Sequence, residues 1–442
     1  MPPLALTFYG DDFTGSTDVM EVLTWAGLET VLFVEPPDAA RLARFPGARA
    51  VGLAGESRGR GPEWMDAHLP GLLGRLAELG APLCHYKVCS TFDSSPQAGS
   101  IGRALEIGQD LLGTPWVPIV VGAPKLNRYQ VFGNLFATVG EEAHRLDRHP
   151  TMSRHPVTPM DEADLRRHLA RQTDRPVGLV DILALKAGRG EARLAAEVAA
   201  GARAVLFDAL DEASLLEVGR LIWEKRPAER TFAVASSGLQ YALTAYWRSR
   251  GWLGLDTRDQ RTGAEAERIV VVSGSGSPET AASIRTALEG GYAGVRLDPR
   301  ATAAGETGPA VREAAAALEA GRNAVLYTAL GPDDPGIVRG DAALRERLGA
   351  GLGAVLRQVL DVSGVRRAVV CGGDTSSSVG QSLGIYALTA IAPLAPGSPL
   401  CRAWAEGPAD GLEIVFKGGQ RGGPGFFEEA RRGRLAEKFA KK

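Results

Sequence analysis

Short runs of apolar and β-branched residues alternate along this chain with longer segments in which apolar residues recur every three or four positions. The short runs predict buried strands, and the longer segments predict amphipathic helices. Val19, Val22 and Leu23 illustrate the helical spacing near the N-terminus. Regular alternation of strands with helices is typical of an α/β fold built on mostly parallel sheets.

The pattern predicts two series of strands. Those of the first series are 4–9, 30–34, 50–53, 82–87, 118–122, 177–180, 204–207 and 231–235. Those of the second series are 269–273, 294–297, 324–327, 368–371 and 412–416. Helices are predicted over 16–26 and 101–112, and the last residues, 435–442, are expected to form a solvated helix end.

The polar, glycine-containing segment 249–267 separates the two series and has the composition of a linker. We therefore place a domain boundary near residue 262. The expected architecture is one domain over 1–262 and a second over 263–442. Each domain is expected to have a mostly parallel sheet flanked by helices, with a cleft between the two. The length of 442 residues suits two such domains.

The composition excludes several classes of protein. A hydrophobic content of 45% is too high for a disordered chain. The 50 basic and 52 acidic residues give a net charge of −2, which offers no electrostatic attraction to nucleic acid. The four cysteines form no Cys-x-x-Cys pair, so we expect neither a disulfide framework nor a zinc site, and we expect a reducing, cytoplasmic location. The start of the chain lacks the pattern of a signal peptide, and the apolar stretches are too short to span a bilayer.

The first predicted strand is followed by Gly-Asp-Asp-Phe-Thr-Gly-Ser, residues 10–16. Two adjacent carboxylates repel each other, so Asp11 and Asp12 need a reason such as a metal ion, a substrate hydroxyl or a helix N-terminus. Phosphoryl transfer uses such a carboxylate to orient or deprotonate the attacking hydroxyl. A structural role, in which Asp12 or Thr14 caps the following helix, explains the pattern equally well.

Residues 86–100 place one lysine, several hydroxyls and one carboxylate between a strand and a helix. This combination suits a small polyhydroxy acid. The candidate substrate-binding residues are Lys87, Ser90, Thr91, Asp93 and Ser95. Only eight of the 50 basic residues are lysines, so a lysine in this loop calls for a reason. A long turn that caps the next helix is the alternative. A nucleophilic role for Cys89 is not expected, because no histidine is placed in the sequence to activate it.

Three glycine-rich loops follow predicted strands of the second domain and suit a nucleotide. Glycines let the backbone approach a phosphate closely, and a lysine supplies a point charge there. The candidate nucleotide-binding residues are Ser275, Gly276, Ser277, Gly372, Gly373, Asp374, Thr375, Lys417, Gly418 and Gly419. The first loop is not a dinucleotide fingerprint, because Glu279 stands where that pattern needs its third glycine.

Three further segments are weaker candidates. The proline-rich loop 148–160 carries two histidines and either completes the substrate pocket or simply crosses the surface. Residues 123–128 and 236–238 follow predicted strands. An ordinary turn explains each of them at least as well as a role in the site does.

These loops in this order resemble the four-carbon acid sugar kinase family, over essentially the whole chain. Asp11, Asp12, Thr14 and Gly15 match its N-terminal signature; residues 274–278, 372–375 and 417–419 resemble its Gly-Ser-x-Ser, Gly-Gly-acid-Thr and Lys-small-Gly loops. The resemblance implies a two-domain α/β kinase that holds an acid sugar in its N-terminal domain and ATP with Mg²⁺ in its C-terminal domain.

The substrate loop departs from the Lys-x-Asp-Ser-Thr-x-Arg-Gly-Asn pattern of many members. Lys87, Ser90 and Thr91 match, whereas Cys89 stands in place of the acid and Asp93 in place of the arginine. A reversal of charge changes how an anionic substrate sits. The variant resembles the branch that acts on related acids such as 3-oxo-isoapionate.

The resulting hypothesis is an ATP-dependent kinase that phosphorylates a terminal hydroxyl of a small sugar acid, with Asp12, or else Asp11, as the base. Closure of the domains is expected to exclude water. Two alternatives stay open: an NAD-dependent hydroxy-acid dehydrogenase and a non-catalytic sugar-acid sensor. The expected partner is a small acid, not nucleic acid or a membrane; a homodimer is one assembly that the sequence leaves open.

Overall fold

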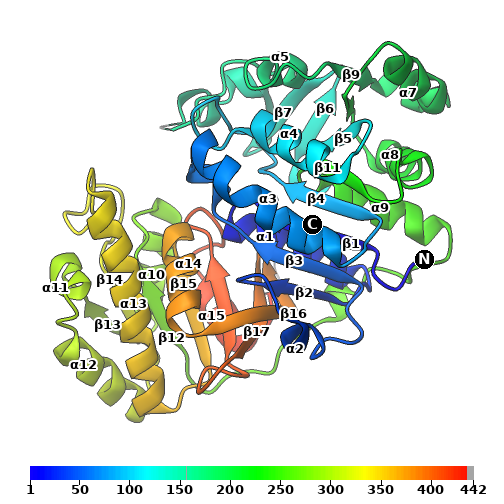
Figure 1. Ribbon diagram of the computed structural model, residues 1–442. Coiled ribbons are helices and arrows are strands. Elements are labelled where there is room, and N and C mark those ends of the chain that lie inside the picture. Colours follow the sequence, from blue (N-terminus) through cyan, green and yellow to red (C-terminus); the bar gives the residue numbers. More distant parts are fainter. Residues whose placement is uncertain (156, 436–442) are drawn as a thin grey trace. The chain divides into compact units, whose positions relative to one another are not determined.

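The computed structural model describes residues 1–155 and 157–435, and the predicted helix end at 435–442 lies almost wholly outside them. The chain forms two compact units. Unit 1 contains Met1–Thr30 and Asp38–Asp256, and unit 2 contains Val31–Pro37 and the chain from Thr257 onward. The predicted α/β class, with mostly parallel strands and flanking helices, is confirmed (Figure 1).

Unit 1 is built on a parallel sheet in the order β3-β1-β4-β11-β5-β10-β9. Its strands are β1 (Leu6–Gly10), β3 (Ala50–Ala54), β4 (Leu83–Lys87), β5 (Val117–Val120), β9 (Val177–Val180), β10 (Ala204–Phe207) and β11 (Thr231–Ala235). The register pairs Gly10 with Lys87, Lys87 with Ala235, and Ala235 with Val120. The carboxyl ends of these strands therefore lie along one edge, which is where α/β sheets bind ligands.

Helices flank this sheet. They are α1 (Phe13–Trp25), α2 (Ala39–Leu42), α3 (Pro62–Glu78), α4 (Ile101–Leu112), α5 (Leu165–Leu169), α6 (Ile182–Lys186), α7 (Gly190–Ala199), α8 (Glu212–Lys225) and α9 (Gly238–Ser249). The strands are almost entirely buried because helices lie on both faces of such a sheet. Packing is close: a Cβ atom on Gly108 of α4 would lie 2.1 Å from Cζ of Phe232 in β11.

A small antiparallel sheet interrupts unit 1, and the sequence pattern did not predict it. Its strands are β6 (Arg128–Val131), β7 (Asn134–Val139) and β8 (Glu142–Arg145). Asp208, directly after β10, anchors the β6–β7 turn by accepting hydrogen bonds from the N–H groups of Phe132 (2.5 Å) and Gly133 (2.9 Å). Most residues of these strands are partly exposed, so they lack the apolar runs that identify a buried strand.

Unit 2 has the strand order β13-β14-β12-β15-β18-β17-β16-β2. The strands are β2 (Thr30–Phe33), β12 (Val270–Ser273), β13 (Ala293–Arg296), β14 (Ala324–Tyr327), β15 (Arg367–Cys371), β16 (Ile385–Ala395), β17 (Ser398–Ala405) and β18 (Glu413–Lys417). The first five in the order are parallel, and the β18-β17-β16-β2 run is antiparallel.

Two features of unit 2 were not predicted. The hairpin of β16 and β17 contains a long, mostly apolar segment, a pattern that does not by itself distinguish a strand from a buried helix. β2 comes from the N-terminal part of the sequence yet pairs with β16, Leu32 with Leu388 and Phe33 with Ala387.

The helices of unit 2 are α10 (Pro278–Glu289), α11 (Pro299–Ala303), α12 (Gly308–Glu319), α13 (Ala342–Ser363), α14 (Gly373–Ser382) and α15 (Phe426–Arg432). The long helix α13 packs against α11, α12 and α14 (Figure 1). In the described part of the chain, none of the helices combines the length and apolar character needed to cross a membrane.

Candidate functional site

The two-aspartate turn lies between β1 and α1. Asp12 is the N-cap of α1, and its Oδ1 accepts a hydrogen bond of 2.7 Å from the N–H of Gly15. The turn is tight, since a Cβ atom on Gly10 would lie 1.9 Å from Oγ of Ser16. The capping role is therefore real, but it occupies only one oxygen of Asp12.

Arg58 holds both carboxylates. Its Nε and Nη2 donate to the two oxygens of Asp11, at 3.1 and 2.7 Å, and its Nη1 donates to Oδ2 of Asp12 at 2.6 Å. Asp11 is buried, whereas the Asp12 side chain is 29% exposed. Burial raises the pKa of Asp11 despite the opposing effect of Arg58. The sequence analysis missed Arg58, which lies in the segment after predicted strand 50–53.

Lys87, the last residue of β4, is almost completely buried. Its Nζ donates to the carbonyl of Val88 at 2.8 Å and lies 3.7 Å from Oδ2 of Asp18 in α1. The ammonium therefore contacts protein oxygens and sits between the end of β4 and the first turns of α1.

The substrate loop after β4 turns its polar groups inward. Thr91 Oγ1 donates to Oδ1 of Asp93 at 2.5 Å and lies 2.9 Å from Sγ of Cys89. Burial acts to raise the pKa of Asp93, but Arg58 and the Thr91 hydroxyl outweigh it, so the pKa is lowered and the carboxylate is ionised. Ser95 Oγ accepts from the N–H of Ala98 at 3.0 Å within its own turn.

Two side chains from a later part of unit 1, His168 and Gln172, hold this loop in place. Ser94 Oγ lies 2.9 Å from Nε2 of His168 and accepts 2.9 Å from Nε2 of Gln172. Gln172 Oε1 accepts from the N–H of Gly102, which orients the amide. The structure thus gathers Asp11, Asp12 and Asp93 around Arg58. Lys87 lies beside α1, and the half-buried Ser90 lies in the substrate loop.

The three glycine-rich loops of unit 2 leave adjacent strands. The register pairs Ser273 of β12 with Cys371 of β15, and Cys371 with Lys417 of β18. The loops meet at this edge: a Cβ atom on Gly274 would lie 2.5 Å from Oγ1 of Thr375, and one on Gly419 would lie 3.2 Å from Oγ of Ser275. A side chain at Gly274 would therefore clash with Thr375, whereas one at Gly419 would crowd Ser275.

A hydroxyl network ties the first of these loops to the third. Ser277 is the N-cap of α10, with its Oγ accepting from the N–H of Thr280 at 3.1 Å and donating to the carbonyl of Gly419. Lys417 is fully buried, and its Nζ donates to Oγ1 of Thr280 at 2.9 Å. Burial lowers the pKa of Lys417. The hydroxyl of Thr280, which the sequence analysis missed, contacts Ser277, Lys417 and the carbonyl of Gly419.

The remaining predicted residues lie at the same edge. Gly372 has a positive φ of 117° and precedes α14, whose first residue is the exposed Gly373. Gly276 forms the first loop with Ser275, and Gly418 lies between Lys417 and Gly419. The side chain of Asp374 lies outside the described part of the structure. The N-termini of α10 and α14 and the intervening glycines suit the phosphates of a nucleotide.

The structure also places the weaker candidates. His149 Nδ1 accepts hydrogen bonds from the N–H groups of Thr151 and Met152, at 3.2 and 3.1 Å, so this ring stabilises the loop in which it lies. Ser236 Oγ donates to the carbonyl of Val121 at 2.6 Å and stabilises the turn into α9. Among the described residues, no three His, Cys, Asp or Glu side chains form a metal-binding group.

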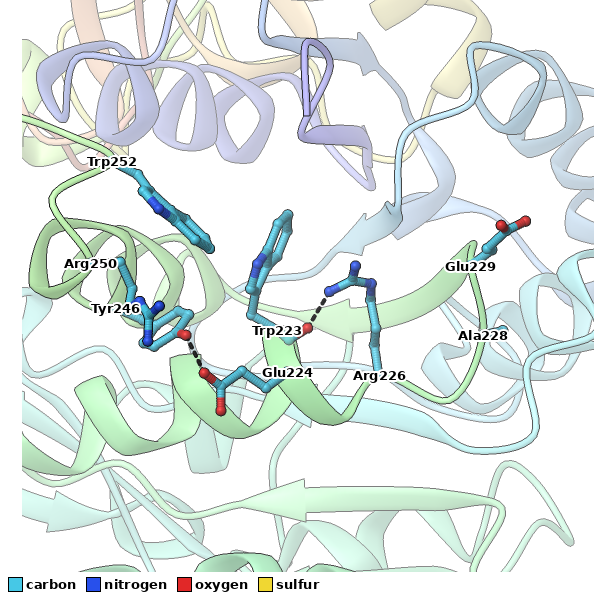
Figure 2. A pocket seen from close by; sticks show the side chains of 8 residues that line it. All are labelled: Trp223, Glu224, Arg226, Ala228, Glu229, Tyr246, Arg250 and Trp252. Atoms are coloured by element: carbon cyan, nitrogen blue, oxygen red, sulfur yellow. Dashed lines mark hydrogen bonds between the residues drawn. The ribbon is translucent and has the colours of Figure 1, made fainter. Parts of the chain in front are cut away.

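A hollow of about 510 Å³ lies elsewhere in unit 1. Figure 2 shows its lining: Trp223, Glu224, Arg226, Ala228, Glu229, Tyr246, Arg250 and Trp252. These residues cluster at the C-terminal ends of α8 and α9, whereas α9 begins at the edge that carries the site loops. A 12-residue helix spans about 18 Å, so this hollow is separate from the site loops.

Known protein families match the sequence of both units. A sugar-binding N-terminal domain matches residues 6–243, and a nucleotide-binding C-terminal domain matches residues 270–427. The 3-oxo-isoapionate kinase of Paraburkholderia graminis is 51% identical, over 98% of this chain and 95% of that protein. The 3-oxo-tetronate kinase of Cupriavidus necator is 34% identical, over 96% of this chain and 95% of that protein.

Solved structures share the fold. A protein of Salmonella typhimurium LT2 aligns with a TM-score of 0.77 at 24% identity, over 98% of this chain and 99% of that one. A protein of Haemophilus influenzae aligns with a TM-score of 0.72 at 25% identity, over 96% and 99% of the two chains.

Proposed function

The chain belongs to the four-carbon acid sugar kinase family and is a sugar-acid kinase, and we propose that its substrate is a 3-oxo sugar acid of the 3-oxo-isoapionate type. The comparisons support neither of the alternatives, a dehydrogenase and a non-catalytic sensor. The observation that carries the proposal is the ionised Asp93 beside Arg58, in a chain 51% identical to a 3-oxo-isoapionate kinase.

Asp93 favours the hydroxyl-bearing end of the substrate. An ionised carboxylate accepts hydrogen bonds from hydroxyls and repels another carboxylate. The acid group of the substrate therefore points away from Asp93, and its hydroxyls point toward Asp93 and Asp12. The hydroxyl of Ser90 and the N–H groups of the same loop complete this side of the site.

Asp12 is the base that we assign to the attacking hydroxyl. Both oxygens of the buried Asp11 are engaged by Arg58, whereas Asp12 is partly exposed and each of its oxygens has one protein donor. A carboxylate oxygen accepts two hydrogen bonds, so Asp12 has capacity for a substrate hydroxyl. Its role is to orient that hydroxyl and receive its proton.

ATP, when bound, supplies the transferred phosphoryl group, and we propose that Mg²⁺ accompanies it. The glycine-rich loops at the ends of β12, β15 and β18 would hold the phosphates through backbone N–H groups, with Ser275 and Thr375 beside them. Mg²⁺ commonly relies on substrate phosphates and one or two carboxylates rather than on an all-protein cage, which agrees with the residues present here.

Use of ATP together with four free cysteines supports a cytoplasmic location. Light scattering on the purified chain measures the oligomeric state, for which a homodimer remains the proposal to test.

The test of the substrate and of the base is an ADP-release assay with ATP and Mg²⁺ on 3-oxo-isoapionate, 3-oxo-tetronates, threonate and erythronate. We expect the highest kcat/KM on 3-oxo-isoapionate. Asp12→Asn should lower kcat by about 100- to 10,000-fold, while ATP still binds. Asp38→Asn is the matched control, because Asp38 is likewise an N-cap, for α2, and lies outside the site.

Equal or higher kcat/KM on a linear 3-oxo-tetronate would contradict the assignment of substrate. Near-normal turnover by Asp12→Asn would remove Asp12 from the role of base. A loss of turnover by Asp38→Asn as well would show that the effect comes from a lost helix cap.

A further inference from the structure

Arg58 occupies a position that no sequence motif in the chain predicts. It lies in the short 3₁₀ helix Ser57–Gly59, which follows β3. Its backbone N–H donates to the carbonyl of Asp11 at 2.9 Å, so main chain and side chain both join this segment to the two-aspartate turn. On the other side, the carbonyl of Arg60 accepts from the N–H of Gly99 at 2.8 Å. The segment therefore connects the turn after β1 with the end of the substrate loop.

The side chain of Arg58 is the positive charge common to three carboxylates. Asp11 and Asp12 accept its hydrogen bonds, and Asp93 is close enough for Arg58 to help lower its pKa. Lys87 does not duplicate this role, because its Nζ is bonded to the Val88 carbonyl beside Asp18. A planar guanidinium can engage both oxygens of one carboxylate and one oxygen of another, which an ammonium cannot do with the same geometry.

The bonds that Arg58 makes distinguish the two aspartates. Asp11 receives two of them and is buried, so it is a fixed counter-charge that orients the guanidinium. Asp12 receives the third at 2.6 Å on Oδ2, while the N–H of Gly15 holds Oδ1. Together the two donors fix the rotation of the Asp12 carboxylate. Without Arg58, only the helix-cap bond would remain.

We propose that Arg58 is a positioning residue for phosphoryl transfer: anchored by Asp11, it holds the Asp12 carboxylate in the orientation that receives the proton of the substrate hydroxyl. This inference rests on the proposed role of Asp12. Misplacement of a reacting group by about 1 Å costs roughly 100-fold in rate. Loss of the guanidinium fork should therefore lower kcat much more than it raises the KM of ATP.

The experiment compares Arg58→Lys and Arg58→Ala with the wild-type chain on the best acid substrate. We expect Arg58→Lys, which retains the charge but not the fork, to lower kcat by about 100-fold, with the KM of ATP within about twofold. Added guanidinium ion at millimolar concentration should restore part of the activity of Arg58→Ala. Arg60→Lys and Arg60→Ala are matched controls, since Arg60 is two residues away and pairs with Glu56 at the surface.

The split between kcat and KM, together with the rescue by guanidinium ion, separates a positioning role from a purely structural one. A variant that has only lost stability regains no activity when guanidinium ion is added, whereas a variant that lacks the positive group beside Asp11 and Asp12 does. Melting temperatures of the variants establish that they are folded; if Arg58→Ala is not folded, Arg58→Lys alone provides the test.

Arg58→Lys with the kcat of the wild type would overturn the inference. So would a change confined to the KM of the acid, which would make Arg58 a substrate-binding residue. A wild-type chain that is inactive on every acid would instead count against the proposed substrate. The variants would then have no activity to compare, so the two failures are distinguishable.

Discussion

Lys87 and Lys417 show what a lysine does inside a polar loop of this protein. The sequence analysis selected both because lysine is rare in the chain, and it expected each ammonium to face a ligand. In the structure both are buried and bonded to protein oxygens. A lysine can bury its methylene stem and still direct three N–H donors to nearby acceptors, so each one joins a loop to an adjacent helix.

Thr280 provides a test of this arrangement in the nucleotide site. Thr280→Val keeps the shape of the side chain but removes the hydroxyl that accepts from Lys417 and donates to the Gly419 carbonyl. The first and third glycine-rich loops should then be less firmly held against each other. We expect the KM of ATP to rise about tenfold, which corresponds to the loss of one hydrogen bond of about 1.4 kcal/mol. The KM of the acid should stay the same.

Steady-state kinetics with ATP varied at saturating acid checks this prediction. Thr286→Val is the matched control, because Thr286 lies on the exposed side of the same helix. An unchanged KM of ATP in Thr280→Val would show that the hydroxyl network does not shape the nucleotide site.

Arg58 marks the limit of what the sequence reveals about residues. The candidate loops were found because each follows a predicted strand and has a distinctive composition. Arg58 lies in Gly-Glu-Ser-Arg-Gly-Arg, one of many arginine-containing segments, and only the pairing of β3 with β1 brings it to Asp11. Its role depends on strand order, which periodicity does not determine.

Elements with strong local patterns were predicted within about one to three residues, and 177–180, 204–207, 231–235 and 324–327 agree with the observed strands. The strands of the β16–β17 hairpin and of the β6–β8 sheet were not predicted. The β16–β17 hairpin reads as an ambiguous apolar run, and β6–β8 have mixed, half-exposed surfaces. Both are defined by pairing between strands, whereas the parallel strands are identified by their own buried composition.

Asp208 is the main anchor of the β6–β8 sheet on unit 1. Its carboxylate accepts from three backbone N–H groups, those of Phe132, Gly133 and Ile182, and burial raises its pKa to about 6. Asp208→Asn would place an amide NH₂ group against these donors. We expect a loss of about 2–4 kcal/mol in the free energy of unfolding of unit 1.

Urea unfolding at pH 8 measures this loss, and hydrogen exchange should show faster exchange in residues 128–145. Asp174→Asn is the control, because Asp174 is exposed. If Asp208→Asn has wild-type stability, the small sheet is held by its other contacts.

At the scale of the whole molecule, the two units differ in their ionisable groups. All six histidines lie in unit 1, and unit 2 has none. Burial lowers the pKa of His85 to about 3 and that of His168 to about 4. Both rings are therefore neutral in the folded unit at pH values where they would be charged in the unfolded chain.

Acid should therefore destabilise unit 1 in particular. A histidine with a lowered pKa contributes its full stability above its unfolded pKa of about 6.5, and this stability is lost as the pH falls toward the folded value. For His168 the loss approaches about 3 kcal/mol near pH 4, and His85 adds a similar amount. Six of the seven tryptophans lie in unit 1, so tryptophan fluorescence follows its unfolding.

Urea midpoints measured by fluorescence at pH 7, 5.5 and 4.5 check this expectation. In His168→Gln the midpoint should depend less steeply on pH, because glutamine does not titrate. The same pH dependence in the variant and the wild type would show that His168 does not supply the linkage.

The position of β2 has a consequence for the order in which the molecule is made. Phe33 leaves the ribosome early, but its partner Ala387 is among the later residues to be synthesised. At about 5–20 residues per second, roughly 20–70 s separate the two. A nascent chain that stops before β16 can contain a complete unit 1 sheet, yet it carries a strand whose place in unit 2 does not exist. The sheet of the nucleotide-binding unit thus contains one strand that is synthesised early and several that are synthesised late. It can be completed only when nearly the whole chain has been translated.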